Sequence, residues 1–220
     1  MKPTVLLKVL ATALFSASIG NAAIIETIAA PNSGSLTANN RLFSSLDSAI
    51  DSGTVYISFT MSSDVVANFY AFELWNGERA DGNDNNRRLK LGNEGGTHGF
   101  GIAGSFGALS SAPAADESFN YIIKLDFDTV GSADTATAFI NPVGLEAANT
   151  SNRTIAATGD IISFDRIAFA AYIGGATLNY SDITIADDWG SAISAIPEPS
   201  STAALLGLGA IALVLRRRKM

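Results

Sequence analysis

The residues best suited to chemistry lie in a short stretch rich in acids and amides, NGERADGNDNN, at residues 76–86. Glu78, Asp81, Asn83 and Asp84 supply carboxylate and amide oxygens, the hard ligands that Ca²⁺ prefers. Their spacing lacks the glycine and the final glutamate of an EF-hand loop. Asp, Asn and Gly also form ordinary solvated turns. Two interpretations stay open: a calcium site, the one cofactor site that the sequence indicates, or a polar loop without metal.

Two further carboxylates, Asp126 and Asp128, are two residues apart on an expected strand and therefore face the same side. A glycosidase needs an acid and a base about 5–9 Å apart, which such a pair could provide. A solvent-facing strand explains the spacing equally well. His98 is the sole histidine and there is no cysteine, so a zinc site or a histidine triad has little support. We expect a loop histidine, and a protein that is not an enzyme.

Residues 99–104, GFGIAG, match the GxGxxG pattern of dinucleotide sites. That function requires an apolar strand before the glycines and a long helix after them. Here a Gly-Gly-Thr-His turn precedes the pattern, and Pro113 limits any helix that follows. We interpret it as a glycine-rich corner or edge of a sheet.

Aromatic side chains offer a different chemistry, because they can stack on sugar rings. Trp75, Tyr172 and Trp189 are the candidates for ligand contact. Most aromatic residues of a β-rich chain belong to its core instead, and the sequence does not separate the two roles.

Alternation of apolar and polar residues predicts the elements that must position these groups. In Val65 to Trp75 it places Phe72 and Leu74 on one face, and Glu73 and Trp75 on the other. No segment has helical periodicity over twelve residues, and Leu42 to Ile50 resembles a helical turn or a loop. We predict eight to eleven strands in an all-β antiparallel sandwich or jelly roll. The expected strands are 24–30, 54–61, 65–75, 89–92, 99–103, 118–128, 135–140, 160–173 and 180–186.

The two ends of the chain differ from its middle. Lys2 and Lys8 precede an apolar stretch that ends in small residues, which predicts a signal peptide over residues 1–22. Residues 23–195 form one domain by size. They carry 20 acidic against 8 basic residues, a net charge of −12. Such a surface suits solubility, and it does not suit nucleic acid or anionic lipid.

The last 25 residues, 196–220, have three parts. Pro197, Glu198 and Pro199 form a rigid extended tripeptide. Residues 203–215 are uninterruptedly apolar and predict a short transmembrane helix of about 20 Å, less than the roughly 30 Å of a bilayer core. Arg216, Arg217 and Arg218 begin a basic cluster that stays in the cytoplasm. We expect a weak, temporary hold on the inner membrane, with a permanent single-span anchor as the alternative.

This tail resembles the PEP-CTERM sorting signal of Gram-negative bacteria that make exopolysaccharide. The resemblance covers residues 196–220 and includes the tripeptide, the short apolar helix and the arginine cluster in order. It implies processing by an exosortase, a membrane-embedded cysteine protease, near Pro197 to Pro199. The body would then reach the cell surface or the extracellular matrix.

The strand series from Thr54 to Trp189 resembles the concanavalin A-like/laminin G jelly roll. The segments that carry the resemblance include TVYISFTM, FYAFELWNG, YIIKLDFDT and the closing YSDITIADDW. It implies a lectin-like module with a carbohydrate-binding or structural role, with exopolysaccharide as a partner. The alternative is a jelly-roll glycoside hydrolase or lyase, although the Glu-x-Asp-x-x-Glu motif of laminarinase-type jelly rolls is absent.

Overall fold

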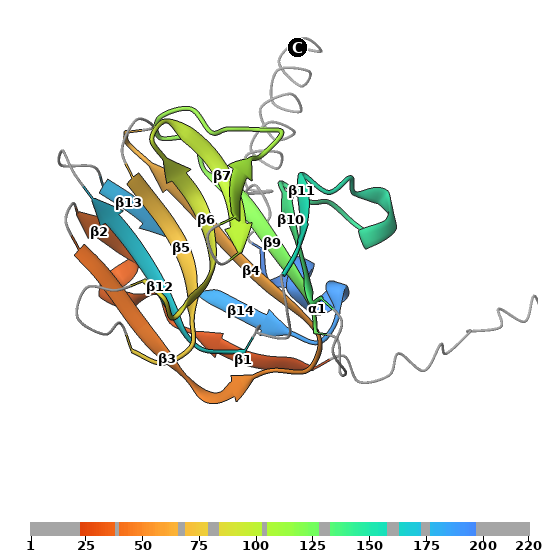
Figure 1. The fold of residues 1–220 in the computed structure, drawn as a ribbon. Helices are drawn as coiled ribbons and strands as arrows, with labels where there is room; N and C mark the ends of the chain where they lie inside the picture. Colours follow the sequence, from red (N-terminus) through yellow and green to blue (C-terminus); the bar gives the residue numbers. More distant parts are fainter. Residues whose placement is uncertain are drawn as a thin grey trace, which may run out of the picture.

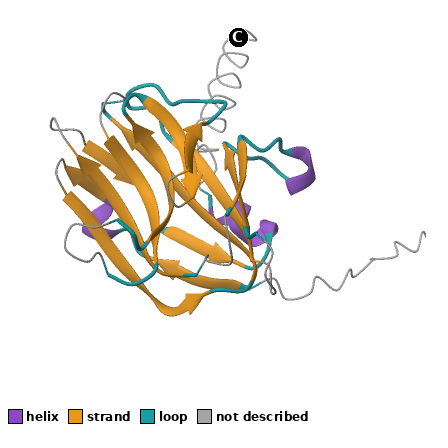
Figure 2. Cartoon of the chain, in the orientation of Figure 1, coloured by secondary structure: helices purple, strands orange, loops and turns teal. Residues whose placement is uncertain are grey.

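The computed structural model describes residues 23–37, 40–65, 69–78, 84–102, 105–127, 133–157, 163–172 and 177–196. Over these ranges the chain forms two antiparallel sheets that pack face to face (Figure 1). Strands dominate, and the helical segments are short (Figure 2). The predicted signal peptide and the predicted helix at 203–215 lie outside these ranges. Within them, no helix has the length and apolar content needed to cross a bilayer.

The eight-stranded sheet has the order β1-β14-β4-β9-β10-β11, and β13 pairs with both β4 and β2. Every strand pair in it is antiparallel. Its strands are β1 (Ile24–Ile28), β2 (Ser35–Thr37), β4 (Gly53–Ser63), β9 (Phe119–Phe127), β10 (Thr135–Ile140), β11 (Arg153–Ala156), β13 (Thr177–Tyr180) and β14 (Ile183–Ala186).

The six-stranded sheet has the order β3-β12-β5-β6-β7-β8. Its strands are β3 (Asn40–Ile50), β5 (Phe69–Trp75), β6 (Arg87–Glu94), β7 (Thr97–Ile102), β8 (Ser105–Ala108) and β12 (Phe164–Tyr172). The chain crosses between the sheets repeatedly, and its first and last strands, β1 and β14, lie side by side (Figure 1). This topology confirms the predicted antiparallel jelly-roll sandwich.

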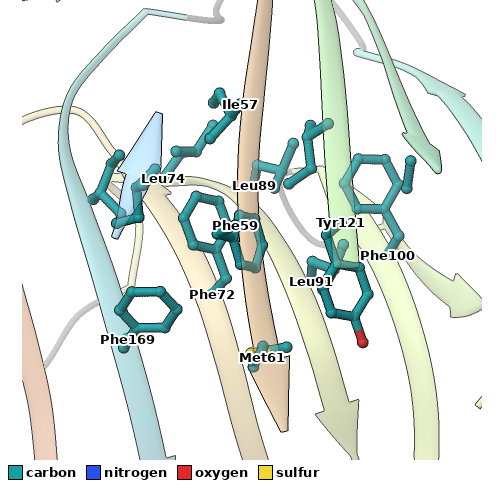
Figure 3. Packing of buried hydrophobic residues seen from close by; sticks show 14 of the residues in the cluster. Ile57, Phe59, Met61, Phe72, Leu74, Leu89, Leu91, Phe100, Tyr121 and Phe169 are labelled. Carbon is teal, nitrogen blue, oxygen red and sulfur yellow. The ribbon is translucent and has the colours of Figure 1, made fainter. Parts of the chain in front are cut away.

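The main core lies between the sheets because strand alternation sends every second side chain inward. Phe59 of β4 stacks on Phe72 of β5, with ring centroids 4.2 Å apart (Figure 3). Phe169 of β12 packs edge-on against Phe72 and stacks on Tyr180 of β13 at 3.8 Å. Aromatic contacts therefore join both sheets, and the face predicted for Phe72 is the one that enters the core.

A second, smaller core lies on the outer face of the eight-stranded sheet. The helix α1 (Trp189–Ala195) packs there, and Trp189 meets Tyr56 and Phe139 edge-on at 6.0 and 5.1 Å. Asp188 caps the helix by accepting a hydrogen bond from the Ser191 amide at 3.1 Å. Burial beneath α1 explains why both faces of β4 are apolar near Tyr56.

Two expectations about local structure were wrong. Leu42 to Ile50 is part of the strand β3, not a helical turn or a loop; β3 pairs only with β12, so this edge strand needs no strict apolar alternation. His98 is not in a loop. It lies in β7, is 5% exposed and points into the core. Fourteen strands occur in the described ranges, more than the predicted eleven, because several pair over three or four residues and leave little pattern in the sequence.

His98 links strands of both sheets through two tyrosine hydroxyls. Its Nδ1 lies 3.4 Å from the hydroxyl of Tyr70 on β5, and its Nε2 lies 3.1 Å from that of Tyr121 on β9. A neutral imidazole suits this position because one nitrogen donates and the other accepts. Burial lowers the pKa of His98 from 6.5 to about 4 and raises the pKa of Tyr70 to about 12.

The free energy of unfolding should therefore depend on pH through His98. Its pKa in the folded state lies below that in the unfolded state, so the unfolded chain takes up the proton first. The contribution is complete above pH 6.5 and is lost as the pH falls toward 4. The loss is on the order of 3 kcal/mol. Urea unfolding at a series of pH values should show this decline, and His98→Gln should flatten it between pH 6.5 and 4.5. Parallel profiles for the two proteins would contradict the assignment.

Candidate functional site

The outer face of the six-stranded sheet has a floor of small residues. One row of paired residues crosses the sheet from strand to strand with almost no side-chain bulk. It runs through Ala170, Ala71, Gly92, Gly99 and Ala108. A Cβ at Gly99 would lie 2.7 Å from the ring of Phe106, so the glycine makes room for that ring. The small residues allow longer side chains from neighbouring rows to lie flat across the sheet.

A carboxylate without exposed surface stands beside this floor. Glu73 of β5 is 0% exposed. Its oxygens meet the guanidinium of Arg41 from β3 at 2.7 and 3.2 Å and that of Arg87 from β6 at 3.1 Å. The indole of Trp75 is the third partner, and its Nε1 donates a hydrogen bond to Glu73 at 3.0 Å. A buried charge is tolerated only with such partners, so these groups form one neutralised unit.

Arg41 also lies between two aromatic rings. Its guanidinium carbon is 4.9 Å from the ring centre of Trp75 and 5.3 Å from that of Tyr172. Phe43 packs edge-on against Trp75, with ring centroids 5.4 Å apart. Phe69 packs against Tyr172 at 5.3 Å. Cations held over aromatic faces are stabilised by the ring quadrupole, more strongly where water is excluded.

Lys90 of β6 extends the same sequence of contacts. Its Nζ lies 5.7 Å from the ring centre of Phe69 and 4.2 Å from that of Phe106, and it forms an ion pair with Glu94. Rings and cations thus form one continuous series of contacts across the sheet. We call it the aromatic–cation row: Phe43, Trp75, Arg41, Tyr172, Phe69, Lys90 and Phe106. Of its rings, Phe69, Tyr172 and Phe106 are half-buried and Phe43 is exposed.

The carboxylates of the site form ion pairs with neighbouring arginines. Asp84 and Glu73 accept from the same Nη1 of Arg87, at 2.9 and 3.1 Å, so their carboxylates are close together. Retaining glycosidases also place two carboxyl groups near one another, about 5 Å apart. Here guanidinium groups neutralise both, and Glu73 has no surface on which to meet a substrate. The arrangement is suited to holding Arg41 and Trp75 in position.

Of the three predicted aromatic contacts, one has an accessible ring. Trp75 is 0% exposed and belongs to the neutralised unit around Glu73. Trp189 is 7% exposed, covers the second core and donates from Nε1 to the carbonyl of Gly144 at 2.7 Å. Neither indole offers an open face to a ligand. Tyr172 is half-buried at the end of β12, within the aromatic–cation row.

The described members of the predicted calcium set face arginines. Asp84 meets Arg87 and Arg41, and Glu78 meets Arg166 at 3.3 Å. Asp81 and Asn83 lie outside the described residues. Within the described ranges, no group of three or more acidic or histidine side chains is arranged to hold a metal ion. The calcium site remains a prediction, and the ion pairs of Glu78 and Asp84 compete with it.

The other candidates are distributed over both sheets. Asp126 of β9 belongs to the eight-stranded sheet, accepts a hydrogen bond from Thr54 at 2.8 Å and lies 3.7 Å from Lys124. Asp128 lies outside the described residues, so the pair is not placed. The first four residues of GFGIAG lie in β7, which is one strand in from the edge strand β8, and Gly101 packs there against the backbone of Ser105.

Sequence reasoning missed Arg41, Lys90 and the role of Glu73. One signal was available: Glu73 is a charged residue inside the aromatic run FYAFELW, on the same strand face as Trp75. A buried carboxylate requires a cationic partner, so the sequence could have predicted that an arginine or lysine from elsewhere in the chain pairs with Glu73. The sequence does not show which arginine pairs with Glu73, because Arg41 is 32 residues away along the chain.

Residues 195–219 match the family model of the PEP-CTERM protein-sorting motif. This confirms the predicted sorting signal, whose Pro197, Glu198, Pro199, Arg216, Arg217 and Arg218 lie in the matched stretch and outside the described residues. The motif implies an exported protein, held at the membrane for sorting and processed by an exosortase. No curated protein sequence matches the chain.

Solved structures with a similar arrangement have low sequence identity to this chain. The globular domain of T. cruzi calreticulin matches at 12% identity over 82% of this chain and 80% of that one, with a TM-score of 0.49. Lectin I from Ulex europaeus, in complex with the methyl glycoside of α-L-fucose, matches at 13% identity over 76% and 89%, with a TM-score of 0.43. The catalytic domain of a glycoside hydrolase family 131 protein from Coprinopsis cinerea matches at 13% identity over 61% and 56%, with a TM-score of 0.37.

Removing the charge of Glu73 should destabilise the fold strongly. Glu73→Gln leaves Arg41 and Arg87 without their shared buried anion, and breaking such a pair costs about 3–5 kcal/mol. Glu78→Gln is the matched control, since its side chain is 81% exposed and pairs with Arg166 at the surface. Exposed pairs contribute about 0–1 kcal/mol. Urea unfolding at pH 7 measures both losses, and equal losses would show that Glu73 has no special structural role.

Proposed function

We propose that residues 23–195 form a carbohydrate-binding module that acts outside the cell. The observation that carries this proposal is the set of half-buried rings in the aromatic–cation row. Phe69, Tyr172 and Phe106 come from three strands and lie over a floor of alanine and glycine. Sugar rings have apolar faces that stack on such side chains. The motif at residues 195–219 brings the module to a compartment where polysaccharide is the expected partner.

Rigidity supports a binding role. Tyr172 is held between Phe69 and Arg41, and Arg41 is fixed by Glu73. Because contacts within the protein itself fix these side chains, little side-chain freedom is lost when a sugar stacks on the rings. The same contacts would work against a catalytic role for Glu73, whose oxygens already have three partners. Binding without cleavage is therefore the function that we propose.

Charge narrows the class of ligand. Residues 23–195 carry a net charge of −12, which repels polyanions at long range. The cations of the binding face are also neutralised where they stand, Arg41 by Glu73 and Lys90 by Glu94. Neither feature attracts an acidic polysaccharide. A neutral glycan, recognised by stacking and by hydrogen bonds, fits the site better.

Replacing Tyr172 should weaken glycan binding without unfolding the protein. With a protein of residues 23–196 and a panel of neutral and acidic polysaccharides, affinity electrophoresis should identify a neutral ligand. Tyr172→Ala and Phe69→Ala should each lower the affinity about tenfold, the effect of losing a stacking contact of roughly 1.4 kcal/mol. Leu145→Ala is the control, since that side chain is 77% exposed and lies in the loop that carries Gly144, beside α1.

Two results would count against the proposal. One is the absence of binding to any polysaccharide, which would leave only a structural role. The other is depolymerisation of a bound glycan, which would restore the enzyme alternative.

Processing should remove both ends of the chain. We propose cleavage near Ala22/Ala23 by signal peptidase and near Pro197 to Pro199 by exosortase, followed by release to the surface or the matrix. The intact mass of the protein recovered from culture fluid should correspond to a polypeptide bounded by these two sites. A recovered mass that includes residues 203–220 would contradict release and favour permanent anchoring.

A further inference from the structure

The outer face of the eight-stranded sheet carries a groove that the carbohydrate proposal does not use. Its volume is about 970 Å³, which is within the range of small-molecule sites in proteins. It lies on the opposite side of the sandwich from the aromatic–cation row. Within the described part of the chain, every side chain that lines it is uncharged. The groove is therefore suited to a neutral ligand.

Two rows of polar residues form the base of the groove. In one row, Asn179 of β13 pairs with Ser62 of β4. In the other, Thr60 of β4 pairs with Asn120 of β9, and Asn141 lies beside Asn120 directly after β10. The strand residues among them point outward because their neighbours along each strand enter the main core.

Asn141 is fixed in a position from which its amide can donate to a ligand. Its φ of 49° lies in the left-handed region, which asparagine tolerates better than most residues. Its backbone N–H donates to the carbonyl of Asn120 at 2.8 Å, and its Oδ1 accepts from the N–H of Asn120 at 2.9 Å. That second bond sets the orientation of the amide. Its Nδ2 has no acceptor among the described residues, so both of its N–H groups are available to a ligand.

Asn120 presents a second amide in the same way. Its Oδ1 accepts a hydrogen bond from the Thr60 hydroxyl at 3.0 Å, and its Nδ2 also lacks an acceptor in the described ranges. Ser62 and Asn179 add a hydroxyl and an amide, each able to donate or accept. The base therefore offers several donors, and a ligand that fits it must bring acceptor oxygens.

The wall of the groove is aliphatic and rigid. Val143 is 68% exposed, yet its N–H donates to Oδ1 of Asn149 at 2.9 Å and its carbonyl accepts from Nδ2 of Asn149 at 2.8 Å. The carbonyl of Gly144 accepts from an indole of α1 at 2.7 Å, which ties this loop to the helix. Ile193 and Ile196, at the end of α1, complete the wall. An apolar group of a ligand can pack here with little loss of side-chain freedom.

We propose that this groove binds a neutral sugar that carries an acetamido group. The acetamido carbonyl accepts from the amides of Asn141 and Asn120, and the acetamido methyl group packs against Val143. The hydroxyls of the sugar bond to the remaining polar groups of the base. A plain hexose supplies oxygens but no methyl group for the wall, and a fatty chain leaves the amides without acceptors.

A second glycan site gives the protein two binding faces on opposite sides of the sandwich. One molecule can then join two polysaccharide chains, and engagement of both faces strengthens its hold on the matrix. This consequence rests on the carbohydrate-binding function proposed above for the aromatic–cation row. The groove site itself does not, because it shares no residue with that row.

Titration calorimetry with two matched disaccharides tests the proposal. The protein comprises residues 23–196, which contain both sheets, both cores and the described lining of the groove, and it carries Tyr172→Ala to weaken the other face. N,N′-diacetylchitobiose has acetamido groups where cellobiose has hydroxyls. We expect it to bind at least tenfold more tightly, because it alone supplies the carbonyl and the methyl group. Equal affinities, or no binding of the acetamido sugar, would overturn the proposal.

Asn141→Asp in the same protein locates the site. The substitution keeps the acceptor for the N–H of Asn120 and tolerates the positive φ, but it replaces both amide donors by an oxygen. The affinity for diacetylchitobiose should fall at least tenfold, while the midpoint of urea unfolding stays the same. An unchanged affinity would contradict the groove site.

Val143→Ser gives a check that does not depend on Asn141. Its side chain is largely exposed, so the fold should tolerate the change, but the tenfold preference for diacetylchitobiose over cellobiose should shrink to about threefold or less. Leu145→Ser is the matched control, since Leu145 is 77% exposed in the same loop and does not line the groove. A preference that survives Val143→Ser, or one lost equally in both variants, would count against the proposed wall.

The same titrations separate this proposal from that for the other face. If diacetylchitobiose binds the natural protein but not the Tyr172→Ala protein, the sugar uses the aromatic–cation row. The groove site then fails and the carbohydrate function stands. If binding is lost only with Asn141→Asp, and Tyr172→Ala weakens binding to no polysaccharide, the groove site stands and the function proposed for the row fails.

Discussion

The proposed binding face depends on the neutralisation of one carboxylate. Glu73 has no exposed surface, so its charge persists only because Arg41, Arg87 and the indole of Trp75 surround it. Arg41 in turn depends on Glu73 for its position. Arg41 comes from an edge strand, and its ion pair with Glu73 fixes it over the sheet, where it can separate the rings of Trp75 and Tyr172.

The aromatic–cation row also requires the small residues of the six-stranded sheet. A guanidinium or a phenyl ring can lie flat on a sheet only where the residues beneath it have almost no side chain. Gly99 meets this need for Phe106, and Ala71 and Ala170 lie in the same row beside Arg41. The outer face therefore gains a rigid aromatic surface without an additional layer of structure, at the cost of strands that are weak by propensity.

The sequence predicted those parts of the fold that rest on alternation, and its predictions failed where alternation is weak. Strands such as β4 and β9 are buried on at least one face, so apolar and polar residues alternate clearly in their sequences. The edge strand β3 did not, because one side of it has no partner. The helix α1 has seven residues, fewer than a periodic pattern needs, although Asp188 before Trp189 is an ordinary N-cap signal. The site was harder to predict still: strand alternation placed Glu73 beside Trp75, but the contact with Arg41 depends on the order of strands.

The two outer faces of the sandwich carry different features. The helix α1 and Ile196 cover the outer face of the eight-stranded sheet, so the chain leaves toward its sorting motif from that side. The aromatic–cation row occupies the outer face of the other sheet. The motif implies attachment at the membrane before processing, and the aromatic–cation row lies on the other face of the sandwich. Because the sandwich core separates the faces, a polysaccharide could be bound before release as well as after it.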